Sequence, residues 1–214
     1  MKREEKSNIL RNKILIASRT LFIKQGYSKT TMRQILGKTG LTTGSLYHFF
    51  RNKEDILKQA ASAYLEESDR VIRSLLNDYD PIVHYIMVIY IQLKVTDNNI
   101  HLTDIWHNAY SLWSVLEMIC LASARRNKTL FGTYNGDMTD DEWFSRSLAI
   151  NGVLHNIIIE KFNRGTMPLL ESLRLVMHIV SSLFNLPVEK IEPSIVNAEK
   201  IMNNNRLQLY GIKV

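Results

Sequence analysis

Apolar residues recur along most of the chain at steps of three and four, which is the spacing of one buried face of an α-helix. The first stripe, Leu10, Ile14, Ala17 and Leu21, predicts a helix that ends at Gly26. Further helices are expected at about 31–39, 42–49, 52–76, 82–95, 139–163, 168–185 and 194–206, and residues 103–127 are expected to form one or two helices. The stretch 82–95 is apolar on every side, which predicts a helix buried on more than one face. The fold class is therefore all-α.

Local signals mark where these helices begin and end. Thr31 with Gln34, and Thr139 with Glu142, have the spacing of a capping box, in which two side chains satisfy free amides at a helix start. The stretch 127–137 contains two glycines and predicts a loop. The remaining signals are the cap Asp80-Pro81 before the apolar helix, the stop at Gly165, and a turn bracketed by Pro187 and Pro193.

Composition narrows the class of protein. With 9 Gly and 4 Pro in 214 residues, a fold of many short strands is disfavoured. Cys120 is the single cysteine, which excludes an intrachain disulfide framework and a multi-cysteine zinc cluster. No apolar run is long enough to span a membrane, and the charged start MKREEKSN is unlike a signal peptide. We expect a cytoplasmic protein without a membrane partner.

Charge is distributed unevenly along the chain. Residues 1–60 hold 13 Lys/Arg and 4 Asp/Glu, a net +9, whereas residues 61–214 hold 14 and 17, a net −3. The segment from Lys6 to Lys53 contains ten basic residues and no acidic one. An uninterrupted basic segment indicates a polyanionic partner, either nucleic acid or an anionic membrane, although a merely basic face would look the same.

The segment from Thr30 to Leu57 favours nucleic acid. Two helices of about eight residues are joined by the tight turn Lys38-Thr39-Gly40-Leu41, which is the pattern of a helix-turn-helix. The second helix has small or polar outward residues, and a B-DNA major groove accepts such a helix. Leu46 and Phe50 are expected to face back toward the core.

At this point the sequence resembles the tetracycline-repressor (TetR) family of regulators, over about residues 8–58. The resemblance implies a three-helix DNA-binding head at 1–58 and a helical effector-binding and dimerisation domain at 59–214. Members are typically homodimeric repressors that a small molecule releases from a near-palindromic operator. The residues that carry the resemblance are Leu21-Phe22, Gly26-Tyr27, Thr30-Thr31, Ile35, Gly40, Gly44, Leu46-Tyr47, Phe50 and Lys53-Glu54.

The resemblance assigns roles by position. Thr31 would offer its hydroxyl and amide to a phosphate, Tyr47 and Lys53 would bind phosphates, and the residues from Thr42 onward would approach the bases. His48 and Phe49 depart from the family pattern, which often has His where Phe49 stands. Simpler alternatives are that Tyr47 only packs, Thr42 only caps and Lys53 is only solvated. The expected DNA contacts are Thr31, Arg33, Thr42, Thr43, Gly44, Ser45, Tyr47, His48 and Lys53.

The C-terminal domain contains a cluster of aromatic residues that suits a ligand pocket. Trp106, Tyr110 and Trp113 are expected on one helical face, because they are spaced by four and three residues. An apolar pocket with a few polar groups is the usual form of a small-molecule site, and plain hydrophobic core is the alternative. The expected effector is partly apolar or aromatic. The candidate effector residues are Tyr90, Trp106, His107, Tyr110, Trp113 and His155.

Other chemistry finds little support in the sequence. No phosphate-binding glycine loop, nucleophile elbow or zinc-protease motif is present, so we expect neither catalysis nor a cofactor. The histidines are scattered, so no metal site is expected, and Cys120 reads as an inert core thiol rather than a redox sensor. Helices 140–163 and 168–185 match the family's dimerisation pair by position, although the stripe along 169–184 also suits an internal bundle. An architectural DNA-binding protein without an effector is the alternative function; a helical enzyme is a third.

Overall fold

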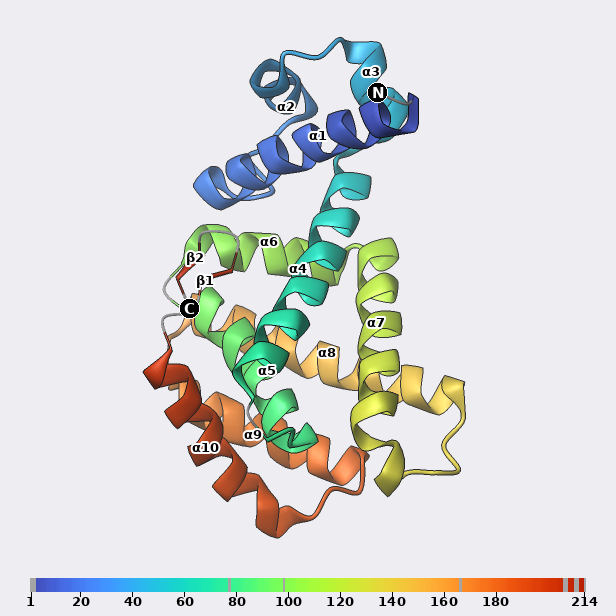
Figure 1. Cartoon of the computed structure of the whole chain (residues 1–214). Helices are drawn as coiled ribbons and strands as arrows, with labels where there is room; N and C mark the ends of the chain where they lie inside the picture. Colours follow the sequence, from blue (N-terminus) through green and yellow to red (C-terminus); the bar gives the residue numbers. More distant parts are fainter. Residues whose placement is uncertain are drawn as a thin grey trace.

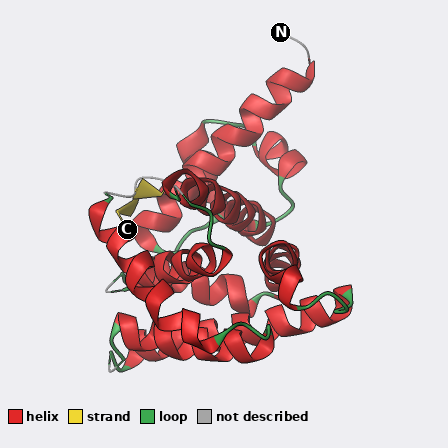
Figure 2. Ribbon diagram, turned by 60° about the horizontal axis from the view of Figure 1, so that its bottom comes forward, coloured by secondary structure: helices red, strands yellow, loops and turns green. Residues whose placement is uncertain are grey.

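A computed structural model shows ten α-helices and one short hairpin in the described residues, which are 3–76, 78–97, 99–165, 167–205, 208–209 and 212–213 (Figures 1 and 2). The hairpin pairs β1 (Gln208–Leu209) with β2 (Ile212–Lys213), antiparallel. The all-α prediction is confirmed. The helices are α1 Arg3–Gln25, α2 Met32–Thr39, α3 Thr43–Phe49, α4 Lys53–Leu75, α5 Pro81–Thr96, α6 Ile100–Ser111, α7 Trp113–Phe131, α8 Asp140–Asn163, α9 Leu169–Leu183 and α10 Ile191–Asn204.

The predicted caps form. Thr31 and Gln34 make a capping box at the start of α2, and Thr139 and Glu142 make another at the start of α8. The Asp80 carboxylate accepts from the amides of Ile82 and Val83 at the start of α5. Gly26, Gly40 and Gly165 have left-handed φ values of +84°, +64° and +65°, so each can end its helix without the strain that a Cβ would add.

Helices α1–α3 form a small unit, here called the head, and α5–α10 form a larger one, the body (Figure 1). α4 starts under the head and runs down into the body, so it belongs to both. α5 lies at the centre of the body and is buried along nearly its whole length. It packs against α4, α6, α7, α9 and α10. This burial explains why its sequence is apolar on every side.

Three details sharpen or correct the sequence prediction. Residues 103–127, which were predicted to form one or two helices, lie in two, α6 and α7, which are separated at Leu112. α7 continues to Phe131 and a 3₁₀ turn follows at Gly132–Tyr134, so the loop predicted at 127–137 is shorter than expected. α10 begins at Ile191, and Pro193 lies in its first turn instead of before it. Proline is compatible with a first turn because amides there have no intrahelical partner.

No helix in the described part of the chain is long and apolar enough to cross a membrane.

Candidate DNA-binding surface and ligand cavities

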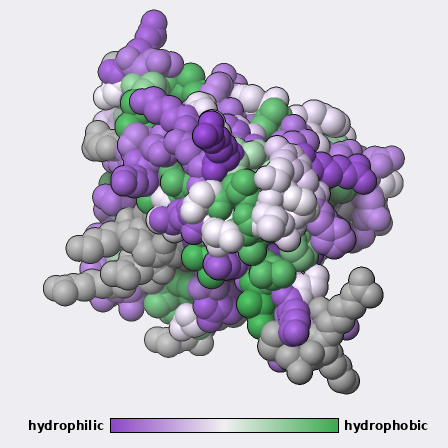
Figure 3. All heavy atoms as spheres, turned by 90° about the horizontal axis from the view of Figure 1, so that it is seen from above, coloured by the Kyte–Doolittle hydropathy of each residue, from purple (hydrophilic) through white to green (hydrophobic). Residues whose placement is uncertain are grey.

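The helix-turn-helix is held together by a small apolar core. Ile35 of α2, Leu46 of α3 and Phe50 after it are at most 1% exposed, as are Ile56 and Leu57 of α4. The expectation that Leu46 and Phe50 face inward is therefore confirmed. This core fixes the angle between α2 and α3 and leaves their polar faces to solvent. Seen from above, the head is mostly hydrophilic around a smaller apolar area (Figure 3).

The start of α2 presents backbone donors to solvent. The Thr31 Oγ1 accepts from the amide of Gln34 at 3.2 Å, and the Gln34 Oε1 accepts from the amide of Thr31 at 2.8 Å. The Thr31 amide is therefore already engaged, which weakens the prediction that it binds a phosphate. The next amides, of Met32 and Arg33, lie in the first turn, where no intrahelical acceptor exists. Together with the exposed Arg33 side chain they suit an anion.

The start of α3 is the most open part of the head. Thr42 caps it, and its Oγ1 accepts from the Ser45 amide at 3.2 Å. Thr42, Thr43 and Gly44 are exposed and Ser45 is half-buried. The space beside Gly44 is open, because no neighbouring group lies within 4 Å of the position that a Cβ would occupy there. These residues form a shallow surface that another backbone or a base edge can approach closely.

Tyr47 and His48 extend from the exposed side of α3. Tyr47 is 48% exposed, so the alternative in which it only packs is disfavoured. His48 is exposed and lies edge-on to Phe49, with their ring centroids 5.1 Å apart. Phe49 is half-buried, whereas His48 faces solvent. Of these two neighbours, only His48 is positioned to meet a phosphate.

The Lys53 ammonium, which was predicted to bind a phosphate, already has contacts within the protein. Its Nζ donates to the carbonyl of Tyr27 at 2.7 Å and lies 4.0 Å from the centroid of the Tyr27 ring. Partial burial lowers the pKa of Lys53, and nearby Asp104 opposes this effect. An ammonium has three donors, so a phosphate contact stays a prediction. The structure shows in addition that Lys53 ties α4 to the turn after α1.

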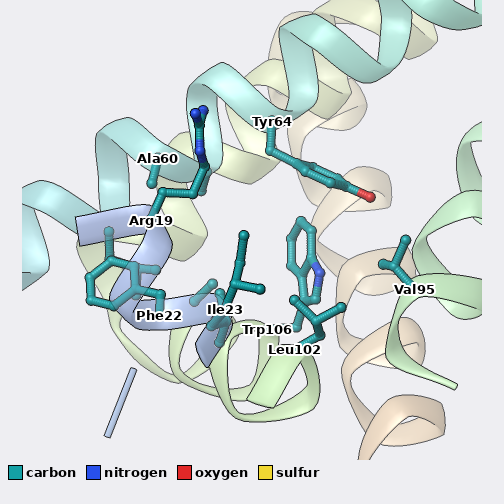
Figure 4. Close-up of a pocket in the computed structure, with 12 residues that line it drawn as sticks. Arg19, Phe22, Ile23, Ala60, Tyr64, Val95, Leu102 and Trp106 are labelled. Carbon is teal, nitrogen blue, oxygen red and sulfur yellow. The ribbon is translucent and has the colours of Figure 1, made fainter. Parts of the chain in front are cut away.

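A cavity of about 70 Å³ lies where the head meets the body, and we call it the junction cavity (Figure 4). Phe22 and Ile23 of α1 form its head side, and Tyr64 and Trp106 form its body side. The two body rings meet edge to face with centroids 5.2 Å apart. Its lining residues are Arg19, Phe22, Ile23, Leu57, Ala60, Ala61, Tyr64, Val95, Leu102, Ile105, Trp106 and Ala109.

A second cavity, about 10 Å³ in volume, lies inside the body, and we call it the interior cavity. Many of the side chains that line this cavity are polar, although it lies among packed helices. Gln92 donates to the buried hydroxyl of Tyr110, and burial raises the pKa of that hydroxyl, which therefore stays protonated. The Asn127 amide donates to Ser147 at 2.9 Å, but its carbonyl oxygen has no hydrogen-bond partner in the described structure. Other polar lining residues are Tyr85, Ser123, Arg126 and Asn151.

Arg126 lies where the interior cavity meets the protein surface. It lines both this cavity and a groove of about 320 Å³ between α4 and α7. Its Nε is buried without a hydrogen-bond partner, and its guanidinium carbon lies 5.4 Å from the ring centroid of Tyr85. No carboxylate forms an ion pair with it in the described residues. A positive charge thus faces a polar cavity without a matching negative charge.

The structure brings four of the six predicted effector residues into a chain of ring contacts. The ring centroids are 5.8 Å apart for Trp106 and Tyr110, 5.4 Å for Tyr110 and His155, and 5.2 Å for His107 and His155. They do not line one common cavity in the described structure. Trp106 lines the junction cavity and Tyr110 the interior cavity. Trp113 is 59% exposed, because the break at Leu112 turns it away from Trp106; the prediction of one continuous face was wrong. Tyr90 is buried on α5 and lines neither cavity.

His107 and His155 form a pair that their sequence positions did not reveal. The Nδ1 of His107 on α6 lies 3.0 Å from the Nε2 of His155 on α8. Burial and the neighbouring His107 lower the pKa of His155. Nowhere in the described chain do three or more His, Cys, Asp or Glu side chains gather in a way that could hold a metal ion. Burial raises the pKa of the Cys120 thiol to about 11, which supports its interpretation as an inert core residue.

Comparison with known proteins identifies the head. Residues 14–60 match the family model described as "Bacterial regulatory proteins, tetR family". The matched segment begins within α1 and ends within α4, and so includes the whole helix-turn-helix. Residues 14–60 are therefore those of a TetR-family DNA-binding head.

The curated relatives match mainly the head. The HTH-type transcriptional regulator HbdR of Aromatoleum sp. (strain CIB) is 35% identical over 78 residues, which is 35% of this chain and 34% of that protein. The repressor KstR2 of Mycolicibacterium smegmatis is 34% identical over 56 residues, 26% of this chain and 27% of that protein. The chain thus spans about a third of the length of the curated relatives that it matches. Sequence similarity therefore says little about the body.

Solved structures extend the likeness to the whole fold. RolR in complex with resorcinol aligns with a TM-score of 0.65 at 13% identity, covering 97% of this chain and 100% of that chain. A TetR-family regulator from Pectobacterium atrosepticum aligns with a TM-score of 0.58 at 18% identity, covering 86% and 98%. At these identities the likeness shows that the body has the TetR fold, and nothing about its ligand.

The body leaves two helix faces open to solvent. The apolar stripe of α9, Leu173, Met177, Val180 and Phe184, is fully buried, so it belongs to the internal bundle. Leu175, on the opposite side of α9, is 43% exposed. On α8 the outward positions hold small residues at helical spacing, which allow another helix to approach closely. They are Ser145, Ala149, Gly152 and Asn156.

Sequence reasoning missed the polar residues around the interior cavity. Gln92, Arg126, Asn127 and Asn151 each lie on the inward face of a mainly apolar helix. A polar residue at a position where helical periodicity predicts an apolar one was the available signal. The sequence prediction relied on aromatic residues instead. Trp113 is exposed, so aromatic character alone does not locate a pocket.

Proposed function

We propose that this TetR-family chain is a homodimeric transcriptional repressor that binds a near-palindromic operator and is released by a small molecule. The observation that carries the DNA-binding part is the family match over 14–60, which coincides with a basic head whose α3 exposes small polar residues. Arg33 and the first amides of α2 would contact phosphates. Thr43, Gly44 and Ser45 would approach base edges in the major groove.

The dimer would form through the outward faces of α8 and α9. These helices lie side by side at the edge of the body, and their small and apolar outward residues suit a four-helix contact between two copies. Such a dimer would hold two α3 helices about 34–36 Å apart, one turn of DNA. The repeated half-site in the operator follows from that two-fold symmetry.

The effector would bind in the groove of about 320 Å³ between α4 and α7, where the groove meets the interior cavity at Arg126, and would carry an acidic group. The interior cavity, at about 10 Å³, has room for a water but not for the whole effector. Arg126 is half-buried, contacts the ring and the hydroxyl of Tyr85, and has no carboxylate partner in the described residues; a bound anion would supply that partner. Gln92, Asn127 and Asn151 would supply hydrogen bonds to a water in the interior cavity. The groove and the cavity adjoin, because Leu65 and Arg126 line both. The ligand would shift the protein toward the conformer for which it has the higher affinity.

In vitro selection from random duplex DNA tests the function. We expect an inverted repeat with half-site centres about 10 base pairs apart, bound by two copies of the chain. Affinity should fall steeply as salt rises, because each neutralised phosphate releases counterions. Selection of no consensus would contradict the proposal and favour the architectural alternative.

Native mass spectrometry of the untagged protein tests the dimer. Leu175→Glu should shift the dimer toward monomer, because it places a charge in the proposed contact. Leu121→Glu is the matched control: Leu121 is similarly exposed, at 45% against 43%, but lies on α7. Equal effects of the two substitutions would contradict an α8–α9 interface.

A further inference from the structure

The imidazole rings of His107 and His155 meet where α6 packs along α8. The Nδ1 of His107 lies 3.0 Å from the Nε2 of His155, so one nitrogen of each ring faces the other ring. A neutral imidazole carries its proton on either of its two nitrogens. When both rings carry the proton on the nitrogen that points away, both facing nitrogens present a lone pair to the space between them.

The spacing of the two facing nitrogens is that of two neighbouring ligands on one metal ion. Bonds from a metal ion to histidine nitrogen are about 2.0–2.1 Å long. Two such bonds place their nitrogens about 2.9 Å apart at a right angle and about 3.3 Å apart at a tetrahedral angle. The observed 3.0 Å lies between these values. The helices therefore already hold the rings at the separation that an ion requires, and rotation about the side-chain torsions would aim both lone pairs at it.

The surroundings hold the His155 ring in place. His155 is half-buried, and its ring centroid lies 5.4 Å from that of Tyr110 on α6. Tyr110 in turn contacts the ring of Trp106 and accepts a hydrogen bond from Gln92. Burial and the neighbouring His107 lower the pKa of His155, which favours the neutral ring that a metal ion binds. Ligands on two packed helices are positioned before the ion arrives.

The remaining coordination positions of such an ion would be open to solvent. His107 is exposed and lines a hollow of about 380 Å³ between the α1–α2 turn, α6 and the end of α8. His101 and Asp104 line the same hollow, but among the described residues no third His, Cys, Asp or Glu gathers with the pair. The protein would therefore supply two ligands and water would supply the others.

We propose that His107 and His155 form a two-histidine site for a divalent late first-row transition metal ion, which joins α6 to α8. Imidazole nitrogen suits Cu²⁺, Ni²⁺ and Zn²⁺, whereas Mg²⁺ favours oxygen ligands. Affinity for a given set of nitrogen ligands is highest for Cu²⁺, so this ion binds most tightly. The site is separate from the groove proposed for the effector and from the DNA-binding surface.

Calorimetric titration of the full, untagged chain with Cu²⁺ tests the site. We expect one ion per chain to bind more tightly than any further ion, and no heat of binding from Mg²⁺ under the same conditions. His107→Gln and His155→Gln keep a side chain that can form a hydrogen bond between the helices, but remove the imidazole ligand. Each should weaken the tight ion by about tenfold or more, because losing even a residue that supports a ligand costs about 10–100-fold.

A matched variant and a double variant show whether the two rings hold the same ion. His101→Gln removes a partly buried histidine from α6 beside the same hollow, and should leave the affinity of the tight ion unchanged. The variant with both His107→Gln and His155→Gln should lose little more affinity than either single variant, because each single change already breaks the site. These titrations use neither DNA nor an effector, so their outcome is independent of the proposed repressor function.

Electron paramagnetic resonance of Cu²⁺ at one equivalent distinguishes two metal ligands from a purely structural hydrogen bond. The wild-type spectrum should show coupling to two imidazole nitrogens, and that of His107→Gln or His155→Gln should show at most one. Equal affinity of Cu²⁺ for the wild type and these two variants, an equal loss in His101→Gln, or a wild-type spectrum without two imidazole nitrogens would overturn the proposal.

Discussion

The carboxylate of Asp104 on α6 accepts two hydrogen bonds from Ser28, in the turn between α1 and α2. The Ser28 amide donates to Oδ2 at 2.8 Å and the Ser28 hydroxyl donates to Oδ1 at 2.5 Å. Asn108 holds the same group, since its Nδ2 donates to Asp104 Oδ1 at 3.2 Å and to Ser28 Oγ at 3.1 Å. A Cβ at Gly26 would lie 2.7 Å from Asp104 Oδ2, so glycine permits the close approach. Together with Lys53 and Tyr27, these bonds fix the head on the body.

Asp104→Ala should loosen this attachment without unfolding either unit. Charge-assisted hydrogen bonds at an exposed site are worth about 1 kcal/mol together, so a loss of that size in unfolding free energy is expected. Hydrogen exchange at the Ser28 amide should become markedly faster, because its acceptor is gone. Asp137→Ala, an exposed loop carboxylate, is the control and should change neither quantity. Unchanged exchange at Ser28 would show that the bond does not hold the turn.

Asp69 should make stability depend on acid pH. His84, through a 2.8 Å hydrogen bond, and Arg73 hold the pKa of Asp69 at about 2, below its ordinary value of 3.8. The folded-state pKa is the lower one, so the stabilisation is complete above about pH 4 and is lost as the pH falls toward 2. Asp69 is 30% exposed, and we therefore expect only about 1 kcal/mol.

Asp69→Asn tests this dependence by urea unfolding at pH 6 and at pH 3. The variant should be less stable than the wild type by about 1 kcal/mol at pH 6, and the difference should shrink at pH 3. Asp137→Asn should show no such difference at either pH. A difference that is constant across this range would mean that the charge of Asp69 is not the cause.

Local sequence signals predict where the helices of this protein lie, but they predict the helix boundaries only in part. Capping boxes at Thr31 and Thr139 act within four residues, and both were read correctly from the sequence. The break at Leu112 has neither glycine nor proline to mark it. Local signals therefore left open whether residues 103–127 form one helix or two.

The residues of the candidate DNA surface could be predicted better than those of the ligand sites, because they are close together in the sequence. Thr42 to Tyr47 lie on one short helix, so their spacing determines which of them face outward. The interior cavity instead joins side chains of α4, α5, α6, α7 and α8. The pairing of His107 with His155, and the position of Arg126 beside Tyr85, depend on how those helices pack.

Tyr47 and Ser45 should affect DNA binding in different ways. Tyr47→Phe removes a hydroxyl that we place on a phosphate, and should weaken all duplexes alike by about fivefold. Ser45→Ala should instead change the preferred base at one position of each half-site, because Ser45 lies near the start of α3, which we propose to face the major groove. Fluorescence anisotropy against the selected operator and its single-base variants measures both. A uniform loss for Ser45→Ala would contradict groove readout by this residue.

Arg126→Met distinguishes a ligand-binding arginine from a structural one. A structural buried arginine has a carboxylate partner, and its removal leaves that partner uncompensated at a cost of about 3–5 kcal/mol. Arg126 has no such partner in the described structure, and its contact with the Tyr85 ring is worth about 1 kcal/mol. Removing the unpaired charge offsets that loss, so the unfolding free energy of the variant should stay within about 1 kcal/mol of the wild type.

The same variant should keep operator affinity, because Arg126 lies in the body, but should lose its response to acidic effectors. A panel of aromatic carboxylates and their uncharged amides provides the readout: carboxylates should raise the melting temperature of the wild type more than the amides do. In Arg126→Met the two series should behave alike. Ser147 accepts from Asn127 within the same cavity, and Ser147→Ala should retain the preference for carboxylates, since it removes no charge. A destabilisation of 3 kcal/mol or more in Arg126→Met would instead assign this arginine a structural role.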